Sequence, residues 1–402
     1  MSQNASPKPL AGLKVLELTR LLPGPFATRL LADLGAEVIK VEDPAGGDYL
    51  RHPPPRIGTV SAHFLANNTG KRSIALDLKN EAGREVLRRL LAQYDILVES
   101  FRPGVMTRLG IDYEQLKTVQ PRLIYASLTG YGQNGPYRDR AGHDLNYLSL
   151  AGAAGLTGAD DGTPVVSGMQ VADLSGALYL AIAILSAVYR REHTGQGCQV
   201  DLAMADTSLA LLALPFAEYI GHNRLPGPAR MIVNGKFVCY RIYRTRDGRF
   251  MSLAALEPKF WVAFCRAVEK PHLCDEAYTR AKPGNPVFDE LVALFASKDQ
   301  AEWVAALENA DCCCEPVLTL AEAAAHPQFA ARRGFRRIDD PVQGSYTQLN
   351  QPIRFTPPVD DSTTPSPALG EHTLMVLREA GMDEPEIEAL AARGAFGDIP
   401  PQ

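Results

Sequence analysis

Residues 13–42 read LKVLELTRLLPGPFATRLLADLGAEVIKVE, and this stretch decides the fold. The apolar run Leu13–Leu18 predicts a strand, and Pro23-Gly24-Pro25 begins a helix that runs to about Leu34. Ala36–Glu42 predicts the next strand. Two strands joined through one helix by short connections run parallel, with a right-handed crossover. The stretch therefore predicts a parallel sheet covered by helices.

The alternation of strand and helix continues along the chain. The next predicted strand is Ser73–Leu78, and the amphipathic helix Asn80–Gln93 follows it. Two more strands are predicted at Asp95–Glu99 and Arg122–Leu128. Such alternation is typical of a doubly wound α/β sheet, whose ligands bind beyond the carboxyl ends of the strands. The turn after the first strand lacks GxGxxG, so the dinucleotide-binding fingerprint is absent.

A second domain is predicted to begin near Met231. Phe237–Tyr243 and Phe250–Ala254 flank the turn Arg246-Asp247-Gly248 and predict a hairpin. The Gly- and Pro-rich segment Gly221–Pro228 before it is the best linker candidate. A length of 402 residues also favours two domains over one core.

Composition excludes several classes of protein. A net charge of −5 argues against general nucleic-acid binding. The seven cysteines contain no CxxC pair, which predicts reduced thiols and no metal site. Met1–Pro9 is polar, and the most apolar run, Ala177–Tyr189, is shorter than the roughly 20 residues that span a bilayer. We expect a cytoplasmic protein that binds neither a membrane nor nucleic acid.

Two titratable residues stand on either side of a Gly- and Ala-rich loop. His143 lies in Ala141–Tyr147, and a histidine can act as a general base because it titrates near neutrality. Asp173 lies where an apolar helix is expected to begin. Both have structural alternatives: a lone histidine is more often structural or exposed, and an N-cap aspartate stabilises its helix by about 1 kcal/mol. Glu257, before a predicted helix, could likewise serve only the helix dipole.

Basic residues gather on or near the ends of the predicted strands: Lys40, Lys71, Arg72, Lys79, Arg102, Arg108, Arg138 and Arg140. Such a cluster could hold the phosphates of a nucleotide-like ligand. For any single member a solvated surface charge is the plain alternative.

Four stretches resemble one known family, in the same order along the chain: Leu13–Glu42, Gly70–Lys79, Phe101–Met106 and Pro121–Ala126. They are similar to the class III CoA-transferases (CaiB/BaiF type, which includes carnitine and formyl-CoA transferases). That superfamily also contains the alpha-methylacyl-CoA racemases.

The resemblance separates two branches at the active site. In the transferases an aspartate like Asp173 attacks acyl-CoA and then carries CoA as an aspartyl-CoA thioester. In the racemases it works with the histidine of a Gly-His-Asp-x-Asn-Tyr motif, which Gly142–Tyr147 matches, and a Glu-Pro-x-Phe motif follows, which Glu257–Phe260 matches. Both matches favour the racemase. Ala172–Gly176 differs from the Asp-Phe-Gly-Gly expected of a racemase and suits a transferase equally.

The racemase resemblance implies that His143 and Asp173 exchange the roles of base and acid at the α-carbon of a 2-methylacyl-CoA. Glu257 would orient and polarise His143. The alternative is CoA transfer between an acyl-CoA and a carboxylic acid through Asp173. Coenzyme A enters as part of the substrate, and neither a prosthetic group nor a metal is expected.

By the same resemblance CoA lies along the strand ends, with Lys40, Lys79, Arg102 and Arg108 near its phosphates. The other residues assigned to the CoA site are Leu76, Phe101, Tyr131, Gly132, Arg138 and Asp144.

The family fold is a homodimer of two interlocked rings. It implies an α/β architecture in which residues 1–222 and 335–402 form a large Rossmann-like domain, with a parallel sheet and flanking helices. Residues 231–330 would form a smaller α+β domain. Residues 223–230 and 331–352 would be the two linkers.

Overall fold

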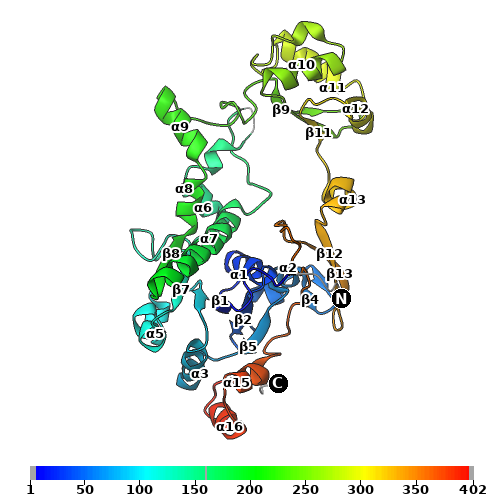
Figure 1. The fold of residues 1–402 in the computed structure, drawn as a ribbon. Coiled ribbons are helices and arrows are strands. Elements are labelled where there is room, and N and C mark those ends of the chain that lie inside the picture. Colours follow the sequence, from blue (N-terminus) through cyan, green and yellow to red (C-terminus); the bar gives the residue numbers. More distant parts are fainter. Residues whose placement is uncertain (1–5, 159–160, 398–402) are drawn as a thin grey trace. The chain divides into compact units, whose positions relative to one another are not determined.

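The structure is a computed structural model that describes residues 6–158 and 161–397. The chain divides into two compact units (Figure 1). Unit 1 comprises Met1–Ala151, Met169–Leu211 and Ala330–Gln402, and unit 2 comprises Gly152–Gly168 and Leu212–Phe329. Unit 1 is therefore assembled from both ends of the chain.

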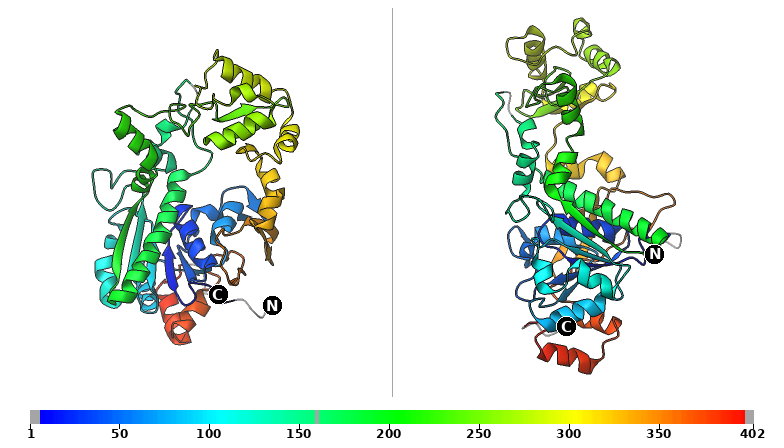
Figure 2. Two further views of the ribbon diagram at one scale, coloured as in Figure 1. Left: turned by 45° about the horizontal axis from the view of Figure 1, so that its top comes forward. Right: turned by 90° about the vertical axis from the view of Figure 1, so that its left-hand side faces the viewer.

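Unit 1 is built on a six-stranded sheet in the order β5-β2-β1-β6-β7-β8, with every neighbouring pair parallel (Figure 2). The strands are β1 Lys14–Leu18, β2 Glu37–Glu42, β5 Arg72–Ala75, β6 Ile96–Glu99, β7 Ile124–Thr129 and β8 Cys198–Ala203. The predicted parallel sheet is thus confirmed. The chain moves outward from β1 to β5 and then from β6 to β8, which puts the topological switch point between β1 and β6.

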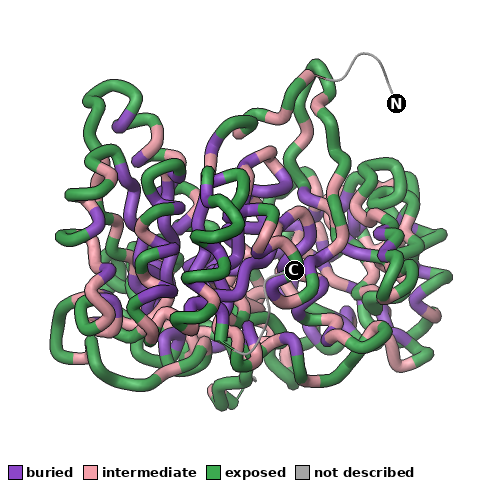
Figure 3. Tube along the Cα trace, turned by 90° about the horizontal axis from the view of Figure 1, so that it is seen from below, coloured by how far each residue is buried: buried purple, intermediate pink, exposed green. Residues whose placement is uncertain are grey.

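Helices cover both faces of this sheet. They are α1 Pro23–Asp33, α2 Ala62–Asn68, α3 Glu81–Leu91, α4 Val105–Leu109, α5 Tyr113–Val119, α6 Asp144–Leu150, α7 Val171–Thr194, α8 Met204–Ala210, α15 Thr373–Glu379 and α16 Glu384–Ala392. Leu16 and Leu18 pack with α3 and α15 in one apolar core, whose buried residues are purple in Figure 3. Because side chains alternate along a strand, Glu17 points to the opposite face, toward α1.

Helix α7 is longer than the expected apolar run. It spans 24 residues and is long and apolar enough to cross a membrane by length and composition, with 44% of its most apolar window buried. Within unit 1 it packs on α1, α6, α8 and the strands β7 and β8. These contacts are those of a core helix in a globular unit. Leu178, Ile182 and Tyr189 on its remaining surface are exposed.

Residues 331–352, expected as a linker, contain regular secondary structure. A hairpin forms there from β12 Phe335–Asp340 and β13 Gly344–Leu349. Farther along, α15 covers the edge strand β5, and the Thr373 hydroxyl accepts a hydrogen bond from the Ala75 N–H at 3.1 Å. A small hairpin of β3 Arg56–Ile57 and β4 Val60–Ser61 also belongs to unit 1.

Unit 2 has a three-stranded antiparallel sheet in the order β11-β10-β9 and an aromatic core. Its elements are α9 Ala213–His222, β9 Tyr240–Arg244, β10 Phe250–Ala254, α10 Pro258–Ala267, α11 Pro286–Phe295, α12 Gln300–Leu307, β11 Cys314–Pro316 and α13 Leu320–Ala325, with α14 Pro327–Ala331 crossing the boundary to unit 1. The hairpin predicted around Arg246–Gly248 is confirmed as β9–β10. Trp261 and Trp303 are both fully buried in this core.

The sequence of Asp206–Ile220 predicts a single helix, and this prediction is wrong. The structure has α8 and α9 instead, with a break at Leu211 and Leu212. Pro215 explains the break, because a proline ring clashes with the carbonyl four residues earlier, here that of Leu211. The division between the units falls at the same place.

Candidate active site

A cavity of about 770 Å³ opens in unit 1 at the carboxyl ends of β1, β6 and β7. Its walls come from four loops, at Leu18–Pro23, Ser100–Pro103, Leu128–Tyr131 and Arg138–His143, and from Asp173 at the start of α7. The cavity therefore lies at the switch point between β1 and β6, where ligands of open α/β sheets bind.

His143 stands immediately before α6 and is exposed. Its backbone N–H donates to the Asn146 side chain at 3.0 Å, which closes the first turn of α6. The Tyr147 hydroxyl donates back to the Gly142 carbonyl at 2.6 Å and so fixes the loop that carries His143. The histidine is thus held at the cavity by its backbone.

Asp173 lies in the first turn of α7, not at its N-cap as expected. The helix begins two residues earlier, at Val171, and the N-cap residue Gln170 makes no side-chain capping bond. Burial and, less strongly, the Asp144 carboxylate raise the pKa of Asp173 against the opposing effect of His143, and the resulting value is about 6. At pH 7 such a carboxyl is ionised in roughly nine molecules of ten, so it can both accept and return a proton.

The N-terminus of α7 is capped from another element. Asp144, the first residue of α6, accepts hydrogen bonds at Oδ1 from the N–H groups of Ala172 at 2.7 Å and Asp173 at 3.2 Å. The sequence assigned Asp144 to the CoA site. The structure places one of its oxygens on α7, and Asp144 is not among the residues that line the cavity.

Four arginines line the cavity, and two of them were not assigned to the CoA site from the sequence. Arg102 and Arg138 were assigned; Arg20 and Arg140 were not. The Arg20 guanidinium donates to the Tyr49 hydroxyl at 2.9 Å and lies 5.6 Å from the centre of the Phe101 ring. Its position directly after β1 was the signal available in the sequence. Phe101 and Tyr131, both assigned, also line the cavity.

Lys40 lies elsewhere. Its side chain is completely buried, and its ammonium contacts Glu17 Oε1 at 3.2 Å, Asp48 Oδ2 at 2.9 Å and the Thr19 carbonyl at 3.0 Å. Burial lowers the pKa of Lys40, but the two carboxylates outweigh it and the net direction is upward. An ammonium enclosed in this way does not fit the expected contact with a CoA phosphate.

Lys71, equally buried, completes this charge cluster of Glu17, Lys40, Asp48 and Lys71. It contacts Glu17 Oε2 at 2.8 Å and donates to the Pro25 carbonyl at 2.9 Å. Burial raises the pKa of Glu17, but the two lysines outweigh it and hold the value at about 2. The cluster fixes the turn after β1, which forms one wall of the cavity.

The remaining assigned residues are outside the cavity lining. Leu76 is buried in the core beside β5, and Lys79 is exposed and pairs with Asp43 at 3.4 Å. Arg108 lies in the last turn of α4, and the Gly132 N–H donates to the Thr129 hydroxyl at 3.0 Å. Their contact with CoA stays a prediction.

Glu257 belongs to unit 2, where it precedes α10 without a side-chain capping bond. Its backbone carbonyl accepts the first hydrogen bonds of that helix, from Phe260 at 3.0 Å and Trp261 at 3.2 Å. Its action on His143 also stays a prediction.

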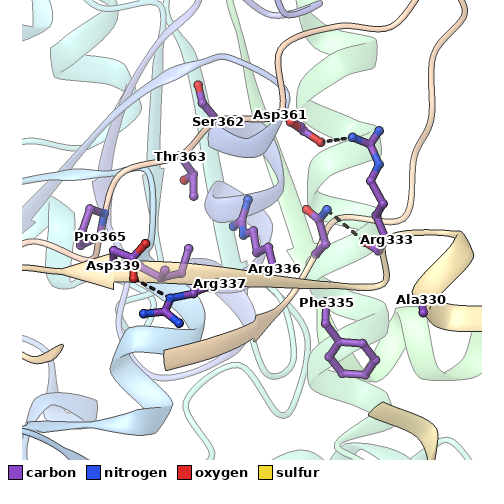
Figure 4. A pocket seen from close by; sticks show the side chains of 12 residues that line it. Ala330, Arg333, Phe335, Arg336, Arg337, Asp339, Asp361, Ser362, Thr363 and Pro365 are labelled. Atoms are coloured by element: carbon purple, nitrogen blue, oxygen red, sulfur yellow. Dashed lines mark hydrogen bonds and ion pairs between the residues drawn. The ribbon is translucent and has the colours of Figure 1, made fainter. Parts of the chain in front are cut away.

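Another hollow, of about 530 Å³, lies beside the β12–β13 hairpin (Figure 4). Arg333 pairs with Asp361 at 2.8 Å, and Arg337 pairs with Asp339 at 2.7 Å. Arg336 pairs with a buried aspartate of α1 at 2.9 Å. Because each guanidinium of this lining faces a carboxylate, the hollow is a poor anion site.

Known proteins match the chain along nearly its whole length. The family model of CoA-transferase family III matches residues 10–373. The chain is 34% identical over 401 residues to the succinyl-CoA:glutarate CoA-transferase of Mus musculus, covering 97% of this chain and 91% of that relative. It is 36% identical over 382 residues to the alpha-methylacyl-CoA racemase of Mus musculus, covering 94% and 95%.

A solved structure agrees in fold as well as sequence. A CAIB/BAIF family protein from Brucella suis superposes with a TM-score of 0.82 at 34% identity, covering 93% of this chain and 100% of that one. The sequence match and the shared fold together show that the chain belongs to CoA-transferase family III.

Proposed function

We propose that this chain is an acyl-CoA enzyme that racemises 2-methylacyl-CoA thioesters by 1,1-proton transfer. The observation that supports this is the presence of His143 and Asp173 in the lining of one cavity, on two different helical segments. The alpha-methylacyl-CoA racemase of Mus musculus is among the relatives, which agrees with the proposal.

The reaction needs a base on one face of the α-carbon and an acid on the other. His143 removes the α-proton from one enantiomer while Asp173 delivers a proton to the opposite face. The two residues exchange roles for the other enantiomer. A carboxyl with a pKa of about 6 is suited to both roles near neutral pH.

The arginines of the cavity supply the charge that a CoA ester requires. Arg20, Arg102, Arg138 and Arg140 are proposed to contact its phosphates, because guanidinium groups pair with phosphate oxygens through two hydrogen bonds. CoA is part of the substrate, and the proposed chemistry uses side chains alone.

The alternative is CoA transfer to a carboxylic acid. It is favoured by one observation: the Asp173 carboxyl faces the cavity and could attack a thioester. The succinyl-CoA:glutarate CoA-transferase of Mus musculus is also a relative. In that reaction Asp173 would carry CoA as a thioester, and His143 would be dispensable.

One experiment separates the two functions. The protein is incubated in D2O with one enantiomer of a 2-methylacyl-CoA, and uptake of deuterium at the α-carbon is followed by mass spectrometry. In parallel, a free carboxylic acid is offered and hydroxylamine is added to trap a thioester on Asp173 as the hydroxamate. His143→Ala and Asp173→Asn are measured beside the parent, with Lys282→Met, at an exposed lysine of unit 2 that has no assigned role, as a control.

Racemisation predicts deuterium uptake without a trapped adduct, and loss of uptake in both variants. CoA transfer predicts an adduct on Asp173, no uptake, and full activity in His143→Ala. An adduct without deuterium uptake overturns the racemase.

We also propose that the protein works as a cytoplasmic homodimer. Within unit 1 the exposed side of α7 carries Leu178, Ile182 and Tyr189, and in unit 2 α9 has no buried residue and exposes Phe216 and Ile220. Apolar surface of this extent marks an interaction site on a soluble protein. Light scattering coupled to gel filtration should give twice the 43.7 kDa chain mass, and a mass equal to one chain contradicts the dimer.

A further inference from the structure

The contact between α6 and α7 joins the two candidate catalytic residues. The Asp144 carboxylate, at the start of α6, accepts both the Ala172 and the Asp173 N–H groups at the start of α7, at 2.7 and 3.2 Å. The first N–H groups of a helix have no partner within the helix, and Gln170 supplies no side-chain cap. Asp144 therefore satisfies donors that α7 would otherwise leave open at the cavity.

We propose that Asp144 is a positioning residue for Asp173: its carboxylate fixes the start of α7 and keeps a second negative charge beside the reacting carboxyl. This inference rests on the proposed function. Asp144 directly follows His143, so one short helix carries both the histidine and the anchor for the aspartate. Any shift of α6 would move His143 and Asp173 together, which preserves the spacing between base and acid.

The negative charge of Asp144 affects the pKa of Asp173. The N-terminus of a helix favours an ionised carboxylate and would lower the proton affinity of Asp173. Burial and the charge of Asp144 act in the opposite direction and raise the pKa of Asp173 to about 6, against the effect of His143. Among the other titratable side chains that line the same cavity as Asp173 are Tyr147 on α6 and Arg102 after β6.

Proton transfer in both directions requires an acid and a base of similar strength. Imidazole side chains titrate near about 6.5, and an unperturbed aspartate near about 3.9. Such a mismatch would leave the proton on the imidazole several hundred times more often than on the carboxyl. Burial and Asp144 raise the pKa of Asp173 toward the range of an imidazole, which suits a carboxyl that must both accept and return a proton.

The test compares two substitutions of Asp144 in the full-length protein. Asp144→Asn keeps an oxygen that accepts the two N–H groups but removes the charge, whereas Asp144→Ala removes both. Asp206→Asn, an exposed first-turn aspartate of α8, is the matched control. The rate of α-deuterium exchange is measured from pH 4.5 to 8.5 for each protein.

For the enantiomer from which Asp173 removes the proton, Asp144→Asn should move the acidic limb of the pH–rate profile to lower pH by about one pH unit, because Asp173 then ionises more easily. Asp144→Ala should in addition lower the plateau rate by at least about tenfold, because α7 loses its cap and Asp173 its fixed position. Asp206→Asn should follow the parent.

The inference is overturned if the pH–rate profile of Asp144→Asn coincides with those of the parent and Asp206→Asn. A residue with only a structural role would leave the acidic limb of the profile where it is. If Asp144→Ala fails to fold, the Asn variant alone decides. Asp173→Asn separates this outcome from failure of the proposed function: persistence of exchange in that variant would refute the racemase itself.

Discussion

Replacement of Lys40 by methionine should destabilise unit 1 strongly, although Lys40 does not line the cavity. Methionine matches the lysine stem in length but removes the ammonium. Glu17 and Asp48 would then share one remaining cation, Lys71, in a place where all four side chains are shielded from solvent. Removing one partner of a buried ion pair costs about 3–5 kcal/mol, because a charge is left without compensation.

The loss should depend on pH. In the parent, the pKa of Glu17 is held at about 2, so this group adds a constant stability between pH 5 and 8. In Lys40→Met the pKa of the Glu17 carboxyl should rise above its value in the unfolded chain. A raised carboxyl pKa favours the folded state below the unfolded pKa, and that contribution disappears as the pH rises through the folded pKa. The variant should therefore be impaired more at pH 8 than at pH 5.

Urea unfolding followed by circular dichroism measures the free energy of unfolding at both pH values. Trp261 and Trp303 both lie in unit 2, so their fluorescence reports that unit and serves as an internal control. Hydrogen exchange of peptides from β1 and β2 localises the effect. Lys79→Met is the matched control, because Lys79 is 79% exposed in its ion pair and should cost less than about 0.5 kcal/mol.

The reasoning would be refuted by a loss below about 1 kcal/mol at pH 8, or by the same loss at pH 5 and pH 8. Either result would mean that the buried cluster is solvated or rearranges freely. A loss as large in Lys79→Met would show that the effect is not one of burial.

Two further substitutions test other parts of the site. Burial raises the pKa of Glu99 to about 7 from an ordinary 4.5. The free energy of unfolding of the parent should therefore fall by about 3 kcal/mol as pH rises between these values. Glu99→Gln should be the more stable protein at pH 8 but not at pH 4.5, and parallel curves of stability against pH would contradict this. A methyl group on Gly142 would lie 2.7 Å from the Tyr147 ring and 2.9 Å from the Tyr131 hydroxyl. Gly142→Ala should therefore slow deuterium exchange by about tenfold or more and lower the free energy of unfolding by about 1–3 kcal/mol. Gly155 has open space around it, so Gly155→Ala should leave the exchange rate unchanged.

Sequence patterns along the chain predicted the parallel sheet, but they did not predict the long-range contacts that complete the site. Five strands of the parallel sheet were predictable, because buried parallel strands are continuous apolar runs: β1, β2, β5, β6 and β7. The cap on α7 was not, because Asp144 lies 28 residues before Ala172 and only the folded chain brings them together. Asp173 was taken for the cap because aspartate is a favoured N-cap residue and this one directly precedes the apolar run that begins at Leu174.

The position of Lys40 could have been predicted. It lies between Ile39 and Val41 in a strand buried on both faces, and a lysine there needs a carboxylate partner. Its neighbour across the parallel register is Glu17. The expectation of a phosphate contact treated a residue within a strand as one at its end. Arg20, which does lie beyond a strand end, lines the cavity.

The construction of unit 1 from both ends of the chain bears on how the protein is made. Val376 and Leu377 of α15 belong to the same core as Ile74 of β5, and the Ala395 carbonyl accepts a hydrogen bond from the Asp77 N–H at 2.8 Å. During synthesis the first 211 residues therefore leave the ribosome with the edge of their sheet bare, while residues 212–329, which make up most of unit 2, are still to be translated. The nascent chain carries an unsealed apolar strand until its last thirty residues arrive, roughly ten seconds or more later at ordinary elongation rates. Over that interval the uncovered edge of β5 is open to pairing with other chains, so a ribosome that stalls in unit 2 would release a fragment prone to aggregation.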